Sequence, residues 1–290
     1  MFIIDTEMVI KLEHVSYSYP RSGAQALKDI SLEIGEGEFL AVMGENGAGK
    51  TTFCKLFNGC IPHSQGGELV GTVTVDGLVT ADSAMAALTG RVGMVLDDPE
   101  TQLFTASVRD EAAFGPENLL MSPAEIEERV ALALEITGLS EYAGLPPASL
   151  SGGQKQRLAI AAALAQANRV LVLDEPASQL DPAGAREVLS LILRIRERRR
   201  MAVIMATHNS EEAAEFADRV CILKNGSVAA CGAPRDIFSD RELLRDNWIR
   251  PPDVSALAHY LDERGERLPF FPARLSEAAA AVIEWLGNGG

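Results

Sequence analysis

The sequence has no apolar run long enough to cross a membrane. The longest obvious run, Leu158–Ala165, is far shorter than the roughly 18 residues that a span needs. Positive charge is also in short supply, because acidic residues outnumber basic ones and the net charge is −15. A nucleic-acid surface would be basic, so we expect no nucleic-acid partner. Any work at a membrane would have to be done through a partner protein.

Cysteine is scarce as well, and its four positions lack the paired spacing of a metal site: Cys54, Cys60, Cys221 and Cys231. We expect reduced thiols that serve mainly in packing, as in a cytosolic protein. The first residues, MFIIDTEM, carry Asp5 and Glu7 but no basic region, so we expect no secretion signal. A chain of 290 residues with 47% hydrophobic residues is expected to bury a full globular core.

Segments typical of strands alternate with helical patterns along most of the chain. The predicted strands are Val9–Leu12, Ile30–Ile34, Phe39–Met43, Gly71–Val75, Gly93–Leu96, Arg169–Leu173, Ala202–Ala206 and Val220–Leu223. The predicted helices outside residues 105–150 are Lys50–Asn58, Gln154–Ala167, Pro182–Arg200 and Ser276–Leu286. This alternation predicts an α/β fold with a mostly parallel sheet, and we expect an antiparallel β region near the N-terminus.

Residues 105–167 interrupt the strand pattern and are predicted to form an inserted helical subdomain. Within them Ser122 precedes Pro123 and Glu125, the arrangement of an N-cap followed by a capping-box acid. No internal repeat is visible, so we predict one main domain over residues 1–240. Residues 241–290 are predicted to form a small helical extension whose role is packing.

The run GENGAGKTT follows a predicted strand and has the spacing of a phosphate-binding loop. Its glycines allow a tight turn in which successive N–H groups point inward and hold a polyphosphate. Lys50 is expected to reach the β- and γ-phosphates, and Thr51 to offer its hydroxyl to Mg²⁺. The loop alone predicts binding of a nucleoside triphosphate, and the residues expected to contact it are Gly44, Asn46, Gly47, Ala48, Gly49, Lys50, Thr51 and Thr52.

A second predicted strand, Arg169–Leu173, is followed by two acids, Asp174 and Glu175. Because parallel strands present ligands at their carboxyl ends, Asp174 is placed to hold hydrated Mg²⁺. Glu175 is placed to polarise a water for in-line attack on the γ-phosphate. Alone, the pair would be equally consistent with a charged loop after a core strand. The phosphate-binding loop in the same chain favours the catalytic interpretation.

The motif LSGGQ provides a second phosphate-binding feature. Ser151, Gly152 and Gly153 lie before or at the start of a predicted helix, whose N-terminus can hold phosphate oxygens. With one phosphate-binding loop already present, this helix start is a surplus anion site. The simplest explanation is that each chain closes over a nucleotide held by another chain.

Together these motifs resemble those of the ATP-binding subunits of ATP-binding-cassette (ABC) transporters, from about Lys11 to Phe238. The resemblance implies a P-loop NTPase fold with a RecA-like core, and an ATP hydrolase. It assigns His208 to contact with the γ-phosphate, Asp181 to organising the facing subunit, and Tyr19 to stacking on adenine. It also implies that one motif contacts ATP across a dimer, through Ser151, Gly152, Gly153 and Gln154.

A narrower resemblance is to the ATPases of energy-coupling factor importers, which take up vitamins and transition-metal ions. It is carried by PETQLFTASVRDEAAFGPENL, Pro99–Leu119, and by WIRPPDVSALAHYL, Trp248–Leu261. It implies a second ATPase subunit, identical or related, beneath a transmembrane scaffold and a separate substrate-binding membrane subunit. The implied location is peripheral, on the cytoplasmic face of the cell membrane. The coupling helices of the scaffold would dock around Gln102–Phe104 and on the helical insertion.

One position departs from the family pattern. The family has Gln where VGMVLDDPE has Asp97, and that Gln normally ligates Mg²⁺ and links the nucleotide site to the membrane partner. Either Asp97 supplies an oxygen that serves the same purpose as that of the Gln, or this nucleotide site is tuned differently and forms one half of a pair of unequal sites.

We therefore predict the ATPase subunit of an energy-coupling factor importer, and two alternatives stay open. A soluble ABC protein of DNA repair or translation would usually carry two cassettes, a long coiled coil or a basic surface, and the sequence has none of these. A regulatory module that binds ATP without hydrolysing it is the second alternative. Glu175 and His208 argue against it.

Overall fold

The computed structural model describes residues 7–166 and 169–287. Asp5, on which the expectation of no secretion signal partly rests, and Ala167, the predicted end of a helix, lie outside the described residues. The chain forms two compact units, Met1–Glu38 with Thr51–Met205, and Phe39–Lys50 with Ala206–Gly290. Among the described residues, no helix combines the length and apolarity needed to cross a membrane.

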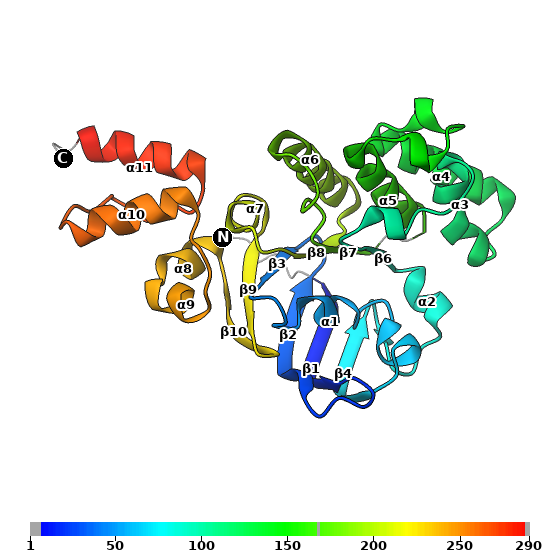
Figure 1. Ribbon diagram of the computed structural model, residues 1–290, viewed down its shortest axis with the longest axis horizontal. Coiled ribbons are helices and arrows are strands. Elements are labelled where there is room, and N and C mark those ends of the chain that lie inside the picture. Colours follow the sequence, from blue (N-terminus) through cyan, green and yellow to red (C-terminus); the bar gives the residue numbers. More distant parts are fainter. Residues whose placement is uncertain (1–6, 167–168, 288–290) are drawn as a thin grey trace. The chain divides into compact units, whose positions relative to one another are not determined.

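The first unit combines a twisted antiparallel sheet, parallel strands and a group of helices (Figure 1). Its strands are β1 (Met8–Ser18), β2 (Gln25–Gly35), β4 (Glu68–Val75), β5 (Leu78–Val79), β6 (Val92–Val95), β7 (Val170–Asp174) and β8 (Ala202–Ala206). Its helices are α1 (Lys50–Cys54), α2 (Met85–Thr89), α3 (Val108–Asn118), α4 (Pro123–Thr137), α5 (Gly152–Gln166) and α6 (Pro182–Arg199). Four single turns of other helix types complete it: Cys60–Ser64, Pro99–Thr101, Ser140–Tyr142 and Pro147–Ser149.

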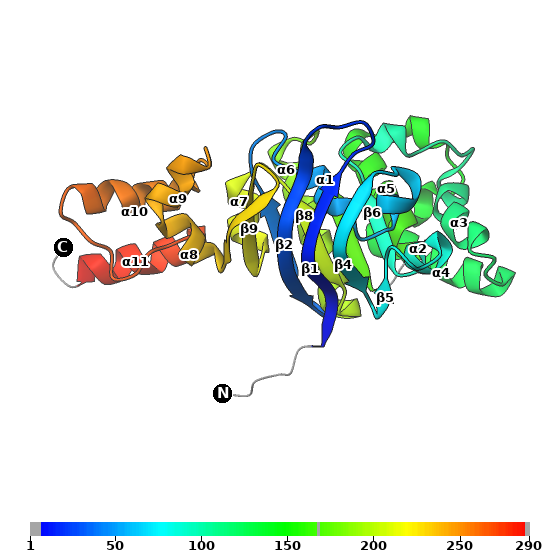
Figure 2. The same cartoon turned by 90° about the horizontal axis from the view of Figure 1, so that it is seen from below.

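The N-terminal sheet is antiparallel, with the order β2-β1-β4-β5, and Figure 2 shows β2, β1 and β4 side by side. Leu12 of β1 lies opposite Leu32 of β2 and Val73 of β4, and all three side chains are buried. Alternation of apolar and polar residues gives such a sheet one face for the core and one for solvent. The predicted antiparallel region near the N-terminus is confirmed.

Strands β6 and β7 pair in parallel, with Val92 beside Val170 and Val95 beside Leu173, and β8 is the next strand after β7. All residues of β7 are buried, and all are apolar except its last residue, Asp174. A continuous apolar run is what a parallel strand covered on both faces requires. This arrangement confirms the predicted α/β class with a mostly parallel sheet.

Helices α3, α4 and α5 lie together in the part of the first unit drawn in green in Figure 1. The predicted start of α4 is confirmed, because Ser122 Oγ accepts a hydrogen bond from the N–H of Glu125 at 3.3 Å. The predicted role of the Glu125 carboxylate in a capping box is wrong. Its Oε1 instead accepts a hydrogen bond from Arg129 at 3.2 Å, because a guanidinium one turn along the helix is a charged donor.

Helix α1 is shorter than predicted and ends at Cys54 instead of Asn58. Asn58 Oδ1 accepts a hydrogen bond from the N–H of Cys60 at 3.0 Å, and Gly59 takes a left-handed φ of 79°. A side chain that bonds to nearby backbone competes with continuation of the helix. The other predicted helices correspond to α5, α6 and α11, and differ from them only at their ends.

The second unit holds three strands and a helical C-terminal part. Its strands are β3 (Phe39–Met43), β9 (Arg219–Lys224) and β10 (Ser227–Gly232), and its helices are α7 (Ser210–Phe216), α8 (Pro234–Ser239), α9 (Arg241–Asp246), α10 (Asp253–Glu263) and α11 (Leu275–Gly287). β3 and β9 are parallel, and β10 returns antiparallel beside β9. β10 was not predicted, because SVAACG has little of the bulky β-branched and aromatic content that marks a strand.

The C-terminal helices are attached to the rest of the second unit by polar contacts. Helices α10 and α11 run alongside each other in both views (Figures 1 and 2). The Ser255 hydroxyl of α10 donates to the carbonyl of Pro272 at 2.9 Å. Arg274 donates to the carbonyls of Ala214 and Ala217, at 2.8 and 3.0 Å. The Ala214 carbonyl lies in the last turn of α7 and the Ala217 carbonyl belongs to the residue that follows the helix, where a cation is favourable.

Candidate nucleotide-binding site

The phosphate-binding loop, residues 44–49, joins β3 directly to α1. Gly44, Gly47 and Gly49 have φ angles of 150°, 81° and 108°, in the region that residues with a Cβ rarely adopt. A Cβ built on Gly44 would lie 2.3 Å from the carbonyl oxygen of Leu223 in β9. The loop therefore requires its glycines, and β9 packs directly behind its first residue.

Lys50 begins α1 and is only 8% exposed. Its Nζ donates to the carbonyl oxygens of Gly44, at 2.8 Å, and of Glu45, at 3.4 Å. Both acceptors are neutral backbone groups of the loop itself, so neither of them balances the charge of the ammonium group. A buried charge is stable when it is paired, and an anion held in the loop would pair with it. The residues present thus fit a polyphosphate.

The two predicted acids lie at the carboxyl end of β7, in the first unit. Asp174 is the last residue of the strand and is 4% exposed. Glu175 follows with a left-handed φ of 51°, which residues other than glycine and asparagine seldom adopt. Its carbonyl accepts a hydrogen bond from the N–H of Ser178 at 3.2 Å, which closes the turn. Backbone outliers of this kind cluster at functional sites.

The LSGGQ motif and the SQLD turn line one cavity of about 520 Å³ in the first unit. Ser151, Gly152, Gly153 and Gln154 form one wall at the N-terminus of α5, and Asp181 lies on the other. Gln154 is folded back, with its side-chain oxygen accepting from the N–H of Ser151 at 2.8 Å. Asp181 caps α6 by accepting from the N–H of Gly184 at 2.8 Å. The structure thus brings together two motifs that are separate in the sequence.

Asp97 lies in the segment that follows β6 and is exposed. Its Oδ1 accepts a hydrogen bond from the N–H of Asp98 at 3.0 Å, and its carbonyl accepts from the side chain of Gln179 at 3.4 Å. Glu100, in the same segment, forms an ion pair with Lys155 of α5. The Asp97 segment is therefore connected both to the SQLD turn and to the helix that carries LSGGQ.

Tyr19 and Thr52 lie together in the first unit. The Tyr19 hydroxyl is 3.0 Å from Thr52 Oγ1, and its ring contacts Tyr17 edge to face at 4.9 Å between centroids. Tyr19 is half-buried, so part of this residue is accessible to a ligand. The predicted aromatic is therefore held at the first turn of α1.

His208 lies between β8 and α7 and is exposed. Its neighbour Thr207 is buried, and the Thr207 N–H donates to the carbonyl of Val42 in β3 at 3.1 Å. On the other side, Asn209 caps α7 by accepting from the N–H of Glu211 at 3.0 Å. His208 is thus presented from a turn that is fixed at both ends within the second unit.

Comparison with known proteins identifies the family. A family model described as "ABC transporter" matches residues 27–178. The energy-coupling factor transporter ATP-binding protein EcfA of Syntrophomonas wolfei is 41% identical over 258 residues, which are 89% of this chain and 92% of that protein. The chain belongs to the ABC transporter ATP-binding proteins. It is an ATPase subunit, and the narrower resemblance to the energy-coupling factor branch is confirmed.

Two solved structures agree with this ATPase. The structure of cbiO1 from Clostridium perfringens, part of the ABC transporter complex cbiONQ, has a TM-score of 0.73 and 32% identity, covering 88% of this chain and 99% of that one. A dimeric ATP-binding cassette in a post-hydrolysis state, bound to ADP and Pi, has a TM-score of 0.67 and 28% identity, covering 78% of this chain and 99% of that one. The predicted P-loop NTPase fold is confirmed, and the family implies dimerisation and membrane partner subunits.

Two residues that fix the segment between β6 and α3, Gln102 and Glu111, were not predicted from the sequence to do so. Gln102 accepts from the N–H of Leu96 at 2.8 Å and donates to the carbonyl of Met94 at 3.4 Å, which ties the Asp97 segment to β6. Glu111 is 4% exposed, and its Oε2 accepts from the N–H groups of Phe104 and Thr105, at 3.0 and 2.9 Å. Gln102 stands in a segment already singled out, but an acid inside a helix is normally solvent-exposed, so nothing marked Glu111.

A groove of about 450 Å³ in the first unit lies over the segment that Gln102 and Glu111 fix. Its lining includes Met94, Leu103, Phe104, Phe114 and Ala162. Phe104 and Phe114 are 66% and 44% exposed and contact each other edge to face at 4.8 Å. Exposed aromatic rings that gather in a groove are typical of a binding surface.

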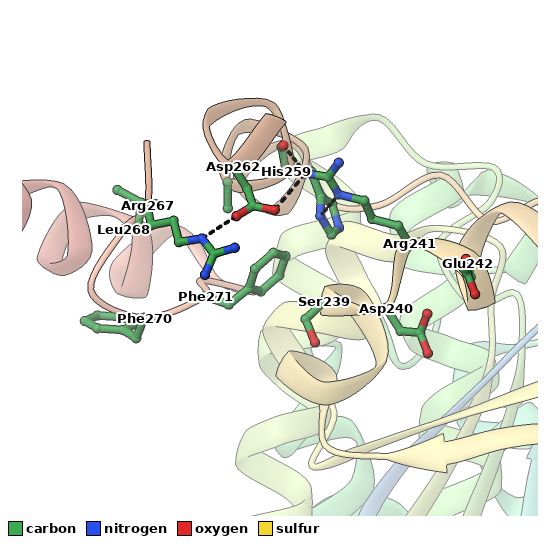
Figure 3. A pocket seen from close by; sticks show the side chains of 11 residues that line it. Ser239, Asp240, Arg241, Glu242, His259, Asp262, Arg267, Leu268, Phe270 and Phe271 are labelled. Atoms are coloured by element: carbon green, nitrogen blue, oxygen red, sulfur yellow. Dashed lines mark hydrogen bonds and ion pairs between the residues drawn. The ribbon is translucent and has the colours of Figure 1, made fainter. Parts of the chain in front are cut away.

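A second cavity, of about 530 Å³, lies in the C-terminal part of the second unit (Figure 3). Asp262 of α10 forms ion pairs there with Arg267, at 2.8 Å, and with Arg241 of α9, at 3.7 Å. Both cations of this cavity are therefore engaged by the protein's own acid. The cluster connects α9 to α10 and was not predicted from the sequence.

Proposed function

We propose that this ATPase powers an energy-coupling factor importer as one of two ATPase subunits. Each subunit would lie on the cytoplasmic face of the membrane, bound to a transmembrane scaffold that serves a separate substrate-binding subunit. The observation that carries the proposal is the pairing of LSGGQ with the SQLD turn around one cavity, in a chain that also has its own phosphate-binding loop. Such a chain carries both halves of a composite site.

The dimer follows from this composition. The loop of one subunit holds the triphosphate, and the LSGGQ cavity of the other covers its γ-phosphate. Ser151 is exposed at the N-terminus of α5, so its hydroxyl and the helix N–H groups can be reached by an anion from outside the chain. Binding of two ATP molecules would close the dimer, and hydrolysis with phosphate release would reopen it. The partner is either a second copy or a related chain.

The proposed chemistry assigns one role to each side chain. Lys50 binds the β- and γ-phosphates, and Tyr19 stacks on adenine. Glu175 accepts the proton of the water that attacks the γ-phosphate in line, while ADP departs with the bridging oxygen. His208 contacts the γ-phosphate. Mg²⁺, held by Thr51, Asp174 and Asp97, would neutralise part of the phosphate charge.

The groove around Phe104 and Phe114 is where we place the membrane scaffold. Its apolar aromatic floor suits an apolar turn of a coupling helix, and its position beside the Asp97 segment connects it to the nucleotide site. The Glu100–Lys155 ion pair extends that connection to the LSGGQ helix. Movement of the scaffold and closure of the dimer would then be coupled through one segment. The cargo would be a vitamin or a transition-metal ion, as the branch implies.

Co-purification tests this proposal. The tagged ATPase, purified from the membranes of the cells in which it naturally occurs, is expected to retain a polytopic membrane protein. The Phe104→Asp variant is expected to lose this partner while keeping basal ATP hydrolysis. Ile283→Asp, which changes another exposed apolar residue, 72% exposed on α11, is the matched control and should retain the partner. A stable protein that copurifies only with nucleic-acid factors would favour the soluble alternative. Absence of phosphate release by the complex would favour the regulatory alternative.

A further inference from the structure

Two cysteines lie directly opposite each other on neighbouring strands of the second unit. Cys221 of β9 and Cys231 of β10 are register partners in the antiparallel hairpin. Side chains paired in this way point to the same face, with Cβ atoms about 4.5–5.5 Å apart. The Cα separations of such pairs also lie within the range that a disulfide spans. The fold therefore places two thiols, ten residues apart in the chain, side by side.

The two thiols have different surroundings. Cys221 is buried. A hydrogen bond with Cys231 is the main cause that raises the pKa of Cys221 well above the ordinary value of a thiol, and burial acts in the same direction. Cys231 is partly exposed, and the Arg219 guanidinium donates to its Sγ at 3.2 Å. A cation beside a partly exposed thiol favours the reactive thiolate. The pair thus consists of the partly exposed sulfur of Cys231, beside a cation, and the buried sulfur of Cys221, which lies opposite Cys231.

The hairpin that carries this pair supports the phosphate-binding loop. Cys221 is paired with Val42 of β3, the strand that leads into the loop. In the hairpin turn, the N–H of Gly226 donates to the carbonyl of Ala48 at 3.0 Å. The Leu223 carbonyl packs against Gly44 so closely that no side chain fits between them. A change in the spacing of β9 and β10 would therefore be transmitted to the loop.

We propose that Cys221 and Cys231 form a reversible disulfide that lowers the affinity of the phosphate-binding loop for nucleotide. The oxidant is a low-molecular-weight disulfide. The Cys231 thiol gives its proton to solvent, its thiolate attacks one sulfur of that small disulfide, and the first small thiolate leaves. The Cys221 thiol then gives its proton to solvent, its sulfur attacks Cys231 Sγ, and the second small thiolate leaves. The two small thiolates take up two protons from solvent, so two protein thiols are oxidised and one small disulfide is reduced to two thiols.

Geometry makes this bond easy to reduce. A disulfide needs Cβ atoms about 3.8 Å apart, which is less than the usual separation of a cross-strand pair, so the hairpin must tighten to accommodate it. A strained disulfide has a more oxidising potential and is readily cleaved by thiols. Reducing conditions would therefore keep the loop in the form that binds nucleotide, and an excess of small disulfides would convert it to the form with lower affinity.

The experiment treats the full chain with oxidised glutathione and follows thiols and nucleotide binding separately. We expect thiol titration in denaturant to fall from four to two, and peptide mapping to show Cys221 linked to Cys231. The affinity for a fluorescent ATP analogue should fall several-fold and return with dithiothreitol. The double variant Cys54→Ser/Cys60→Ser should form the same link and lose affinity in the same way, with its thiol count falling from two to zero. Cys231→Ser should bind nucleotide normally and be insensitive to the oxidant.

Three results would overturn the inference. A link between Cys54 and Cys60, or no link at all, would show that the hairpin pair is not the oxidised site. Glutathione retained on Cys231 would show that Cys221 cannot resolve the mixed disulfide. A complete Cys221–Cys231 link with unchanged affinity would show that the loop does not sense the hairpin. The coupling rests on nucleotide binding by the loop, but the thiol measurements do not depend on transport or hydrolysis, so their failure is separate from failure of the proposed function.

Discussion

Arg241 donates a hydrogen bond from Nε to Nδ1 of His259 at 2.7 Å, while His259 Nε2 lies 2.9 Å from the carbonyl oxygen of Phe238. An arginine cannot accept a hydrogen bond, so this arrangement requires a neutral imidazole that carries its proton on Nε2. Burial lowers the pKa of His259 below its ordinary value, and the charge of Arg241 acts in the same direction. The hydrogen bond with Phe238, and after it the acids Asp262 and Glu263, oppose this lowering of the pKa without reversing it.

The neutral His259 predicts that the folded ATPase loses stability in acid. The unfolded chain binds this proton at a higher pH than the folded one, so stability is complete above the ordinary pKa of histidine. It is lost as the pH falls from there towards the lower pKa of the folded state. Urea unfolding midpoints measured across this pH range should fall more steeply for the wild type than for His259→Gln. Parallel curves would show that another group controls the acid response.

Glu175→Gln is expected to bind ATP but to hydrolyse it very slowly. The substitution keeps the shape of the side chain and removes the basic carboxylate, which as a general base is worth about 10²–10⁴-fold in rate. ATP that is not hydrolysed should hold two subunits together, so the variant should accumulate as a dimer in size-exclusion chromatography with MgATP. Asp181→Asn is a useful comparison, because it changes an acid on the SQLD turn outside the proposed proton transfer. Near-normal phosphate release by Glu175→Gln would refute its role.

Ser151→Arg is expected to abolish hydrolysis while leaving nucleotide binding by the monomer nearly unchanged. Ser151 lines the LSGGQ cavity, so a bulky cation there should block closure onto the partner's nucleotide without disturbing the chain's own loop. Titration with a fluorescent ATP analogue and a phosphate-release assay separate the two effects. Equal loss of monomer affinity would place Ser151 at the chain's own nucleotide.

Mixing variants makes the same prediction sharper. A chain with Ser151→Arg retains an intact loop, and a chain with Lys50→Ala retains an intact LSGGQ cavity. Their heterodimer should regain one of its two composite sites and hydrolyse ATP, while either variant alone does not. No recovery in the mixture, with dimers present, would argue against a site shared between subunits.

Asp97→Gln is expected to raise the Mg²⁺ concentration needed for half-maximal hydrolysis while leaving the maximal rate within several-fold. Unlike charges about 4 Å apart attract by about 4 kcal/mol at an effective dielectric of 20, so an acid at this position should strengthen metal binding. Repulsion from the γ-phosphate should also weaken metal-free ATP binding by the wild type. Hydrolysis against free Mg²⁺, and ATP-analogue binding with and without Mg²⁺, check both effects. Superimposable curves for the two proteins would leave Asp97 only the loop contacts seen in the structure.

The sequence predicted most of the strands and the placement of the nucleotide-site motifs, because these depend on local patterns. Apolar runs fix β3, β7 and β8, and the glycines of the loop are required by its backbone angles. The contacts it did not predict depend on tertiary structure. Glu111 lies in a helix, where an acid is normally exposed, and only the fold turns it towards Phe104. Cys221 and Cys231 form a pair only because β10, a strand that the sequence did not predict, returns beside β9.

The left-handed backbone at Glu175 has a consequence for how this ATPase can adapt. A residue with a Cβ costs roughly 1–2 kcal/mol in that conformation, whereas glycine adopts it freely. Glu175→Gly should therefore be more stable than Glu175→Ala by about 1 kcal/mol in urea unfolding, although both lack the carboxylate. Equal stabilities would show that the neighbouring turn imposes no such cost. Selection for heat resistance alone would tend to replace the acid with glycine. Persistence of glutamate at this position would therefore indicate that selection for ATP turnover outweighs selection for stability of the fold.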